Sequence, residues 1–230
     1  MPNAVKAVLF DLDGTLLDTA PDLGAALNHV CRLHQRGEIA AEHFTPHASH
    51  GSRGLLNLAF ADVLTQNEHK AAQLREQFLT YYNDNIADRS CLFPGIADVL
   101  EALQQADIRV AIVPNKPLQL THRLLPYFTE FSHIDVVVGG DTLAVAKPHP
   151  EPLLYAAERL GVDAKSCLYV GDAERDIQAG INAGMVTVLA AYGYISNLDQ
   201  PQRWGADYTI QHAQELLKIL SVADISEITD

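Results

Sequence analysis

Basic residues are scarce in this sequence. Lysine and arginine number 16 against 29 aspartate and glutamate residues, so the formal charge at pH 7 is −13. Proteins that bind nucleic acid or anionic membranes need a basic surface, and we therefore expect neither as a partner. The same balance raises a question about any small anionic ligand, because the protein as a whole would repel it.

Long apolar runs and paired cysteines are missing as well. No run approaches the roughly 18 residues of a membrane-spanning helix, and acidic residues instead of a cleavage site follow the apolar stretch near the N-terminus, so we expect neither a membrane span nor a signal peptide. Cys31, Cys91 and Cys167 are far apart and form no CxxC motif, which is typical of reduced cysteines. We therefore expect a cytoplasmic protein, as a monomer or a homodimer.

The overall composition is that of an ordinary globular protein. Apolar residues make up 48% and charged residues 20% of the 230 residues, which excludes a disordered chain. A chain of this length forms one or two domains and buries enough surface to fold without a disulfide or a structural metal.

Short β-branched apolar runs alternate with helical patterns along most of the chain. The runs resemble strands that are buried on both faces of a parallel sheet, and they cover residues 5–10, 108–113, 134–138, 167–170, 186–190 and 208–210. Apolar residues at helical spacing predict helices over residues 95–106, 151–160 and 174–183. This alternation predicts an α/β fold with a Rossmann-like parallel sheet and right-handed crossovers.

One stretch interrupts this alternation. Residues 17–87 contain no convincing strand pattern and indicate helices over residues 20–35, 53–64 and 68–83. We predict a helical cap domain of residues 17–87, inserted into a core domain of residues 1–16 and 88–230. The insertion follows the first strand, and ligands bind at the carboxyl ends of the strands in open α/β sheets, so we expect the cap to act as a lid.

The first motif is Asp11-Leu12-Asp13-Gly14-Thr15, directly after the first apolar run. Residues two apart on an extended backbone point to the same side, and Gly14 allows the turn that brings both carboxylates to one point. A plain Asp-Gly turn is the simpler interpretation, but it would not require a second aspartate beside a buried strand.

Three further segments with polar residues follow predicted strands. They are Pro114-Asn115-Lys116, Lys147 within Ala-Lys-Pro-His-Pro, and Gly171-Asp172-Ala173-Glu174-Arg175-Asp176. Taken alone, Lys147 could be a solvated lysine and Asp176 a favourable charge at a helix N-terminus. Because the ends of parallel strands meet at one edge, however, Asp11, Asp13 and Asp172 should form an acidic cluster that is costly without a cation. Mg²⁺ suits such a cluster, since it binds through carboxylates, water and substrate phosphate.

Together these residues resemble the haloacid dehalogenase superfamily in its phosphatase branch. The pattern of that family is DxDGT, then Thr or Ser followed by Asn-Lys, then a lysine, then GDxxxD. This sequence contains four matching segments in the same order: DLDGT, PNK, Lys147 and GDAERD. The resemblance covers nearly the whole chain. Several core segments are similar to bacterial phosphoglycolate phosphatases, whereas GSRGLLNLAF and AAYGYISNLDQPQRWGAD are more similar to N-acetylmuramic acid 6-phosphate phosphatases.

The resemblance implies a mechanism. Asp11 would attack phosphorus and form an aspartyl-phosphate, while Asp13 would protonate the leaving alcohol and then activate water. An Asp11 carboxylate oxygen, the Asp13 backbone carbonyl and Asp172 would hold Mg²⁺. Lys147 would stabilise the charge of the transferring group, and Asp176 would orient Lys147 or the water around the metal.

A second set of residues would bind the phosphate. The resemblance assigns Gly14, Thr15, Asn115 and Lys116 to this role. Pro114 departs from the family pattern, because proline offers neither the hydroxyl of threonine or serine nor a backbone N–H. We expect this departure to give a slower or weaker-binding enzyme.

Substrate selection should depend on the cap. Arg53, in a Gly-Ser-Arg-Gly segment that resembles a cap loop of the family, is expected to pair with a substrate carboxylate, although it could equally be a surface arginine. Asp18 matches a family position at the boundary of core and cap, without an assigned role. His43, His47 and His50 look like a metal cluster, but their polar surroundings favour solvated histidines.

Three functional interpretations remain open. The leading one is a Mg²⁺-dependent phosphatase of a small phosphorylated metabolite, with phosphoglycolate as the first candidate and N-acetylmuramic acid 6-phosphate as its rival. A phosphomutase of the β-phosphoglucomutase type would use the same aspartyl-phosphate. Pro114 motivates the third interpretation, a family member without catalytic activity.

Overall fold

A parallel sheet forms the centre of the molecule in the computed structural model, which describes residues 5–134 and 136–225. Six strands follow one another in the order β5-β4-β1-β6-β7-β8, and all neighbours are parallel. Their bounds are β1 (Ala7–Phe10), β4 (Arg109–Ile112), β5 (Val136–Val137), β6 (Cys167–Gly171), β7 (Val186–Ala190) and β8 (Tyr208–Ile210). The predicted α/β fold is confirmed; residue 135 of the predicted strand 134–138 lies outside the described residues.

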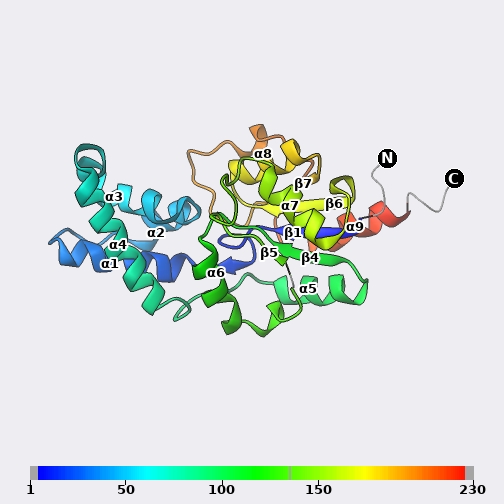
Figure 1. Ribbon diagram of the computed structural model, residues 1–230, viewed down its shortest axis with the longest axis horizontal. Coiled ribbons are helices and arrows are strands. Elements are labelled where there is room, and N and C mark those ends of the chain that lie inside the picture. The colour runs from blue at the N-terminus through cyan, green and yellow to red at the C-terminus, as the bar shows by residue number, and fades with distance from the viewer. Residues whose placement is uncertain (1–4, 135, 226–230) are drawn as a thin grey trace.

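Helices cover both faces of this sheet (Figure 1). The helices α7 (Glu151–Leu160) and α8 (Glu174–Ala183) lie on one face, and α5 (Ile96–Gln105) and α9 (Glu215–Ile225) on the other. On β1, Ala7 and Leu9 pack in one cluster with α7 and α8, whereas Val8 and Phe10 pack in a second cluster with α5 and α9. Burial on both faces explains why this strand carries no charge.

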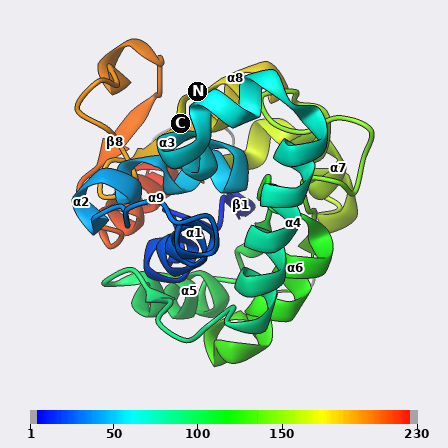
Figure 2. The ribbon, with the colours of Figure 1, turned by 90° about the vertical axis from the view of Figure 1, so that its left-hand side faces the viewer.

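Four helices form a separate group beyond the carboxyl ends of the strands (Figures 1 and 2). They are α1 (Ala20–Leu33), α2 (Ala41–Phe44), α3 (Gly51–Gln66) and α4 (Glu68–Asp84), and they confirm the three helices predicted in this stretch. Leu23, Leu27 and Val30 recur on one side of α1 and are buried against α3 and α4. We keep residues 17–87 as the proposed cap.

A short antiparallel ribbon joins the two ends of this helical group. The strands β2 (Leu17–Asp18) and β3 (Cys91–Leu92) pair with each other, with Leu17 opposite Leu92. The prediction that residues 17–87 contain no strand is therefore wrong at residues 17–18. Two residues are too few for a period-2 pattern, and the partner strand lies far along the chain.

Short elements complete the fold. They are α6 (Leu118–Leu124) and the 3-10 helices Thr45–His50, Leu125–Tyr127, Thr129–Phe131, Ala164–Ser166 and Pro201–Arg203. Within residues 5–134 and 136–225, none of the helices combines the length and the apolar character that crossing a bilayer requires.

Candidate active site

Three buried carboxylates meet at the carboxyl ends of β1 and β6. Asp11 follows β1, Asp172 follows β6, and Asp176 lies in the first turn of α8; one oxygen of each lies within 4.8 Å of the other two. All three residues are at most 2% exposed. We expected the carboxylate of Asp13 in this group, but the structure places that of Asp176 there instead.

The Asp13 carboxylate turns toward a cation from the neighbouring loop. The Lys116 ammonium lies 2.8 Å from Asp13 Oδ1, and the Thr19 hydroxyl donates to the same oxygen at 2.6 Å. The Lys116 ammonium also lies 4.6 Å from the centre of the Tyr82 ring on α4, a cation–π geometry. The attraction between Asp13 and Lys116 explains why the period-2 spacing did not bring Asp13 to the other carboxylates.

Lys147 joins two of the three buried carboxylates. Its ammonium lies 3.0 Å from Asp11 Oδ1 and 2.8 Å from Asp176 Oδ1, and it donates to the Tyr169 hydroxyl at 2.7 Å. Tyr169 in turn donates to the Val113 carbonyl at 3.0 Å. The Lys147 side chain is fully buried, and its ammonium makes two ion pairs and one hydrogen bond there. Sequence reasoning missed Tyr169 because it lies in the middle of an apolar strand.

The carboxylates differ in how their surroundings change their acidity. Burial, and then the Asp176 carboxylate, raise the pKa of Asp11 to about 7 and that of Asp172 to about 6. Burial alone would raise the pKa of Asp176 too, but Lys147 and then Arg175 lower it below its ordinary value. The nearby positive charges do not offset the effect of burial on Asp11 and Asp172, and a bound cation would add to them.

Asp172 has the contacts expected of a metal ligand. The Ser49 hydroxyl and the Tyr194 backbone N–H donate to its Oδ2 at 2.8 and 2.9 Å, and no cationic side chain of the described residues lies within 4 Å of it. The same Ser49 hydroxyl lies 3.4 Å from the Asp13 backbone carbonyl. That carbonyl and Asp172 Oδ2 therefore face a common point, and such hard oxygen donors fit Mg²⁺.

Two glycines allow the close packing around Asp172. At Gly14, where φ is +91°, a Cβ atom would lie 2.2 Å from Asp172 Oδ2. At Gly193, a Cβ would lie 2.3 Å from Asp172 Cβ and 2.4 Å from the Gly14 carbonyl. The Thr15 hydroxyl also faces Asp172, at 3.4 Å, and Thr15 is fully buried. Gly14 and Thr15 thus support Asp172 directly, whereas their expected contact with phosphate stays a prediction.

Asn115 locks the loop after β4 to the loop that carries Lys147. Its side-chain N–H donates to the Lys147 carbonyl at 2.9 Å, and its side-chain oxygen accepts from the Lys147 N–H at 3.1 Å. The Asn115 amide therefore positions Lys147. It is not available for phosphate in this arrangement, so only the backbone of Asn115 could serve that role.

A cavity of about 420 Å³ opens over Asp11, between the edge of the sheet and the helical group. Asp13 and Lys116 contribute to its lining from the sheet side, and Arg53 and Arg75 contribute from α3 and α4. Both of these arginines are exposed. The cavity is therefore acidic at Asp11 and carries cations on the helical side.

Arg175 also lines this cavity, and sequence reasoning gave it no role. Its guanidinium NH2 lies 3.8 Å from Asp11 Oδ2. Arg175 lies in the first turn of α8, where the helix dipole disfavours a cation. That unfavourable position within the GDAERD motif is the signal by which the sequence could have revealed it.

The remaining candidates lie around this site. The Tyr194 hydroxyl donates to Asp18 at 2.7 Å, beside the β2–β3 ribbon. The ring centres of His47 and His50 are 5.8 Å apart, and burial, then nearby Arg175, lower the pKa of His50. In the part of the chain that the structure describes, neither these histidines nor His43 belongs to a cluster of three potential metal ligands.

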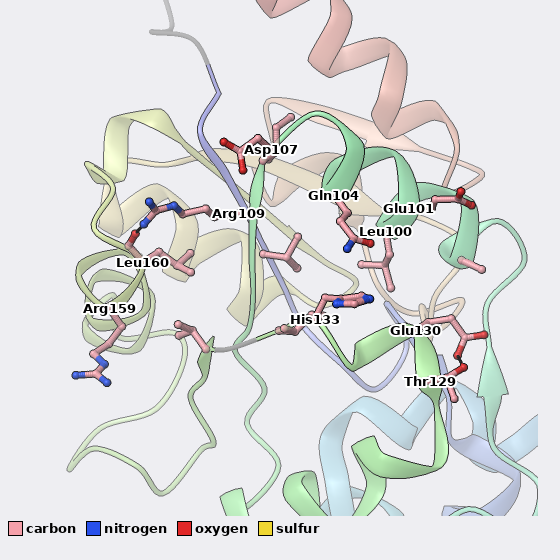
Figure 3. Close-up of a pocket in the computed structure, with 15 residues that line it drawn as sticks. Leu100, Glu101, Gln104, Asp107, Arg109, Thr129, Glu130, His133, Arg159 and Leu160 are labelled. Carbon is pink, nitrogen blue, oxygen red and sulfur yellow. Dashed lines mark hydrogen bonds between the residues drawn. The ribbon is translucent and has the colours of Figure 1, made fainter.

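A second cavity, of about 510 Å³, lies at the opposite end of β4 (Figure 3). Its charged side chains are mostly exposed, and Figure 3 shows Asp107 and Arg109 at one end and Glu101 and Glu130 at the other. Arg109 donates to the Leu160 carbonyl. This cavity is larger, but its groups do not converge on one point, so it does not compete with the first as a catalytic site.

Comparisons with known proteins give consistent matches over most of the chain. The sequence profile of one family, described as haloacid dehalogenase-like hydrolase, matches residues 5–184. A phosphoglycolate phosphatase of Xanthomonas campestris pv. campestris (strain 8004) is 44% identical over 217 residues, which cover 92% of this chain and 94% of that protein. An N-acetylmuramic acid 6-phosphate phosphatase of Pseudomonas aeruginosa is 36% identical over 219 residues, which cover 95% of this chain and 96% of that protein.

A solved structure shows the same fold. The crystal structure described as a predicted phosphoglycolate phosphatase from Haemophilus somnus superposes with a TM-score of 0.84. It is 30% identical in sequence, and the alignment covers 94% of this chain and 98% of that one.

Proposed function

The chain belongs to the haloacid dehalogenase-like hydrolases and is a phosphoric monoester hydrolase, and we propose that it is a Mg²⁺-dependent phosphatase that works through an aspartyl-phosphate on Asp11. One observation carries this proposal. The buried carboxylates of Asp11, Asp172 and Asp176 lie together, Lys147 pairs with Asp11 and Asp176, and Asp11 lines a cavity. A nucleophile, a cation and hard metal ligands together are the parts that phosphoryl transfer needs.

In the first step, an Asp11 carboxylate oxygen attacks phosphorus and the bond from phosphorus to the substrate oxygen breaks. Asp13 gives a proton to the departing alkoxide, which leaves as an alcohol. Lys147, 3.0 Å from Asp11, stabilises the negative charge on the transferring group. Asp176 holds Lys147 in place through the 2.8 Å contact between them.

In the second step, Asp13 takes a proton from water, and the oxygen of that water attacks the phosphorus on Asp11. The bond to Asp11 breaks, which frees phosphate and restores the carboxylate. Asp11, Asp172 and the Asp13 carbonyl are the groups that would hold Mg²⁺. When bound, the metal supplies positive charge that reduces repulsion between the nucleophile and the incoming phosphate.

The helical group acts as the cap in this proposal. Ser49 contacts Asp172 at 2.8 Å, and the Tyr82 ring covers Lys116, so the cap is closed against the core in this structure. Closure excludes bulk water and strengthens the electrostatic interactions around Asp11. A cytoplasmic location and a monomeric or homodimeric state stay predictions.

Phosphoglycolate is the proposed substrate, and it is supported by the named relatives at 44% identity. An amino-sugar phosphate such as N-acetylmuramic acid 6-phosphate is the second candidate. Two observations favour it: a relative of that name at 36% identity, and a cavity of about 420 Å³, which is roomy for a two-carbon acid. Both compounds carry a carboxylate besides the phosphate, which gives an arginine of the cap a partner.

The test is a screen of phosphate release with Mg²⁺, using 2-phosphoglycolate, N-acetylmuramic acid 6-phosphate, hexose phosphates and an aryl phosphate. The Asp11→Asn variant is the blank. The highest kcat/KM on 2-phosphoglycolate supports the first candidate, and the highest value on the amino-sugar phosphate moves the assignment to the second. Turnover that requires an added sugar bisphosphate would indicate a phosphomutase, because a mutase must keep water from its intermediate. No activity even on the aryl phosphate would indicate a non-catalytic member, as Pro114 suggested.

Substrate selection by Arg53 gives a separate prediction. Arg53→Ala should lower kcat/KM for the carboxylate-bearing substrate by about 10- to 100-fold, mainly through KM, because one charge-assisted pair is lost. Activity on the aryl phosphate should change little. Arg123→Ala, an exposed arginine on α6 outside the cavity, is the matched control. An equal loss on every ester would refute a role in selection.

A further inference from the structure

Three cationic side chains surround Asp11 and Asp13, and two of them are already committed. Lys147 is ion-paired with Asp11 and Asp176 and donates a hydrogen bond to the Tyr169 hydroxyl. Lys116 pairs with Asp13 at 2.8 Å and lies against the Tyr82 ring. Neither ammonium can contact a new anion without giving up a contact that it makes here.

Arg175 is the third cation, and most of its donors are not used. Its NH2 lies 3.8 Å from Asp11 Oδ2, which is longer than a hydrogen bond. Its Nε is buried and has no hydrogen-bond partner among the described residues. The side chain is only 19% exposed, and it lines the cavity over Asp11. A guanidinium has five N–H donors in a fixed fork, so this one can bind an anion that enters the cavity.

The surroundings of Arg175 act on its charge in opposite directions: burial lowers the pKa of the guanidinium, but nearby carboxylates, Asp176 first, raise it by more. A cation in the first turn of α8 opposes the helix dipole, and burying a guanidinium without full pairing carries a desolvation penalty. An exposed arginine elsewhere on α8 would avoid both costs. The carboxylates therefore hold Arg175 beside Asp11, and the donors that they leave unpaired are available to a ligand.

The cavity also lacks donors where a phosphate would need them. Pro114 has no hydroxyl and no N–H, the Asn115 amide holds the backbone of Lys147, and the Thr15 hydroxyl faces Asp172. Arg175 lies close enough to Asp11 to reach a group that is bound to, or approaching, that carboxylate. Its planar fork matches two oxygens of a phosphoryl group.

We propose that Arg175 is a phosphate-binding residue, which donates through its guanidinium to the oxygens of the phosphoryl group positioned on Asp11. This inference rests on the proposed function, because the phosphoryl group is the one that Asp11 accepts in that reaction. Arg175 thereby supplies the phosphate with hydrogen-bond donors, which Pro114 cannot supply.

The test is the affinity of the full chain for inorganic phosphate in the presence of Mg²⁺, measured by isothermal titration calorimetry. Arg175→Met should bind phosphate about 10- to 100-fold more weakly, which corresponds to the loss of a charge-assisted contact. Arg175→Lys keeps the charge but not the planar fork, so its affinity for phosphate should lie between those of the parent and Arg175→Met. Arg123→Met, on the exposed face of α6, should bind phosphate like the parent.

A second titration, with Mg²⁺ alone, separates ligand binding from a structural role. Removing a cation beside Asp11 should leave the Mg²⁺ affinity unchanged or raise it. An Arg175→Met variant that binds phosphate normally overturns the inference, and so does one that loses Mg²⁺ and phosphate together, because Arg175 would then support the fold. Phosphate binding is measured without turnover, so a chain that hydrolyses no ester would refute the proposed function without deciding this point.

Discussion

Asp11→Asn should lower kcat/KM by about 10⁴-fold or more, since removing a covalent nucleophile costs enzymes that much. Asparagine keeps the size of the side chain and an oxygen that can accept the Leu12 N–H bond, which is 2.8 Å long. It cannot form the acyl phosphate that water then hydrolyses. The loss should appear in kcat with every ester in the screen, because all of them would pass through the same residue.

The folded state should tolerate this replacement. Asp11 is one of three buried carboxylates that repel one another, and the neutral amide removes one of those charges. We therefore expect the Tm of Asp11→Asn, measured with a chelator present, to equal or exceed that of the parent. Asp98→Asn, an exposed position on α5, controls for the chemical change. Residual activity above about one hundredth of the parental kcat/KM would exclude Asp11 as the nucleophile.

Lys147→Met should damage both activity and stability. Methionine fills much of the same space but leaves Asp11 and Asp176 without the ammonium that now lies 3.0 and 2.8 Å from them. Breaking a buried pair from one side costs about 3–5 kcal/mol of unfolding free energy. For a chain of this size, that corresponds to a fall in Tm of about 6–20 °C. Activity should fall about 10²- to 10³-fold, because the transferring group loses a preorganised positive charge.

Mg²⁺ distinguishes this explanation from a simple packing defect. Because the metal would restore positive charge beside Asp11, it should raise the Tm of Lys147→Met by more than it raises the Tm of the parent. Lys165→Met, at an exposed position, should behave like the parent in thermal unfolding and in turnover. A Tm within about 2 °C of the parental value would mean that the buried carboxylates do not need Lys147.

The net charge of −13 does not prevent an anion from binding here. The cavity gathers Arg53, Arg75, Lys116 and Arg175 around a small volume, whereas long-range repulsion is screened within about 10 Å at ordinary salt. A small phosphate ester meets those local cations once it enters. The net negative charge therefore disfavours the binding of large polyanions but not of a compact substrate.

The sequence predicted the sheet and the position of the site through one physical rule. Short apolar runs mark parallel strands, and the polar residues that follow them meet at one edge. This rule predicted a cluster of Asp11, Asp13 and Asp172, and the structure brings Asp11 and Asp172 together, with Asp176 in place of Asp13. The catalytic roles of Asp11 and Lys147 and the metal-binding role of Asp172 stay proposals.

What the sequence could not show depends on contacts between distant side chains. The rotamer of Asp13 follows from Lys116, about a hundred residues later in the chain, at 2.8 Å. Ser49 reaches Asp172 from a segment without a recognisable motif. The pairing of the Asn115 amide with the Lys147 backbone could not be predicted, because a short motif does not reveal which loop its side chain will bind. Hydrophobic periodicity predicts which face of a helix or strand is buried, but it does not predict which distant side chains pair.

The β2–β3 ribbon bears on how this chain could have been assembled. Leu17 lies opposite Leu92, so the chain leaves the core and returns to it at adjacent points. An insert whose two ends are side by side can grow, shrink or be exchanged without shifting the register of the sheet, and lengthening such a loop costs little entropy. The catalytic residues proposed on the core could therefore have stayed fixed while whole inserts, and with them substrate preference, were replaced in evolution.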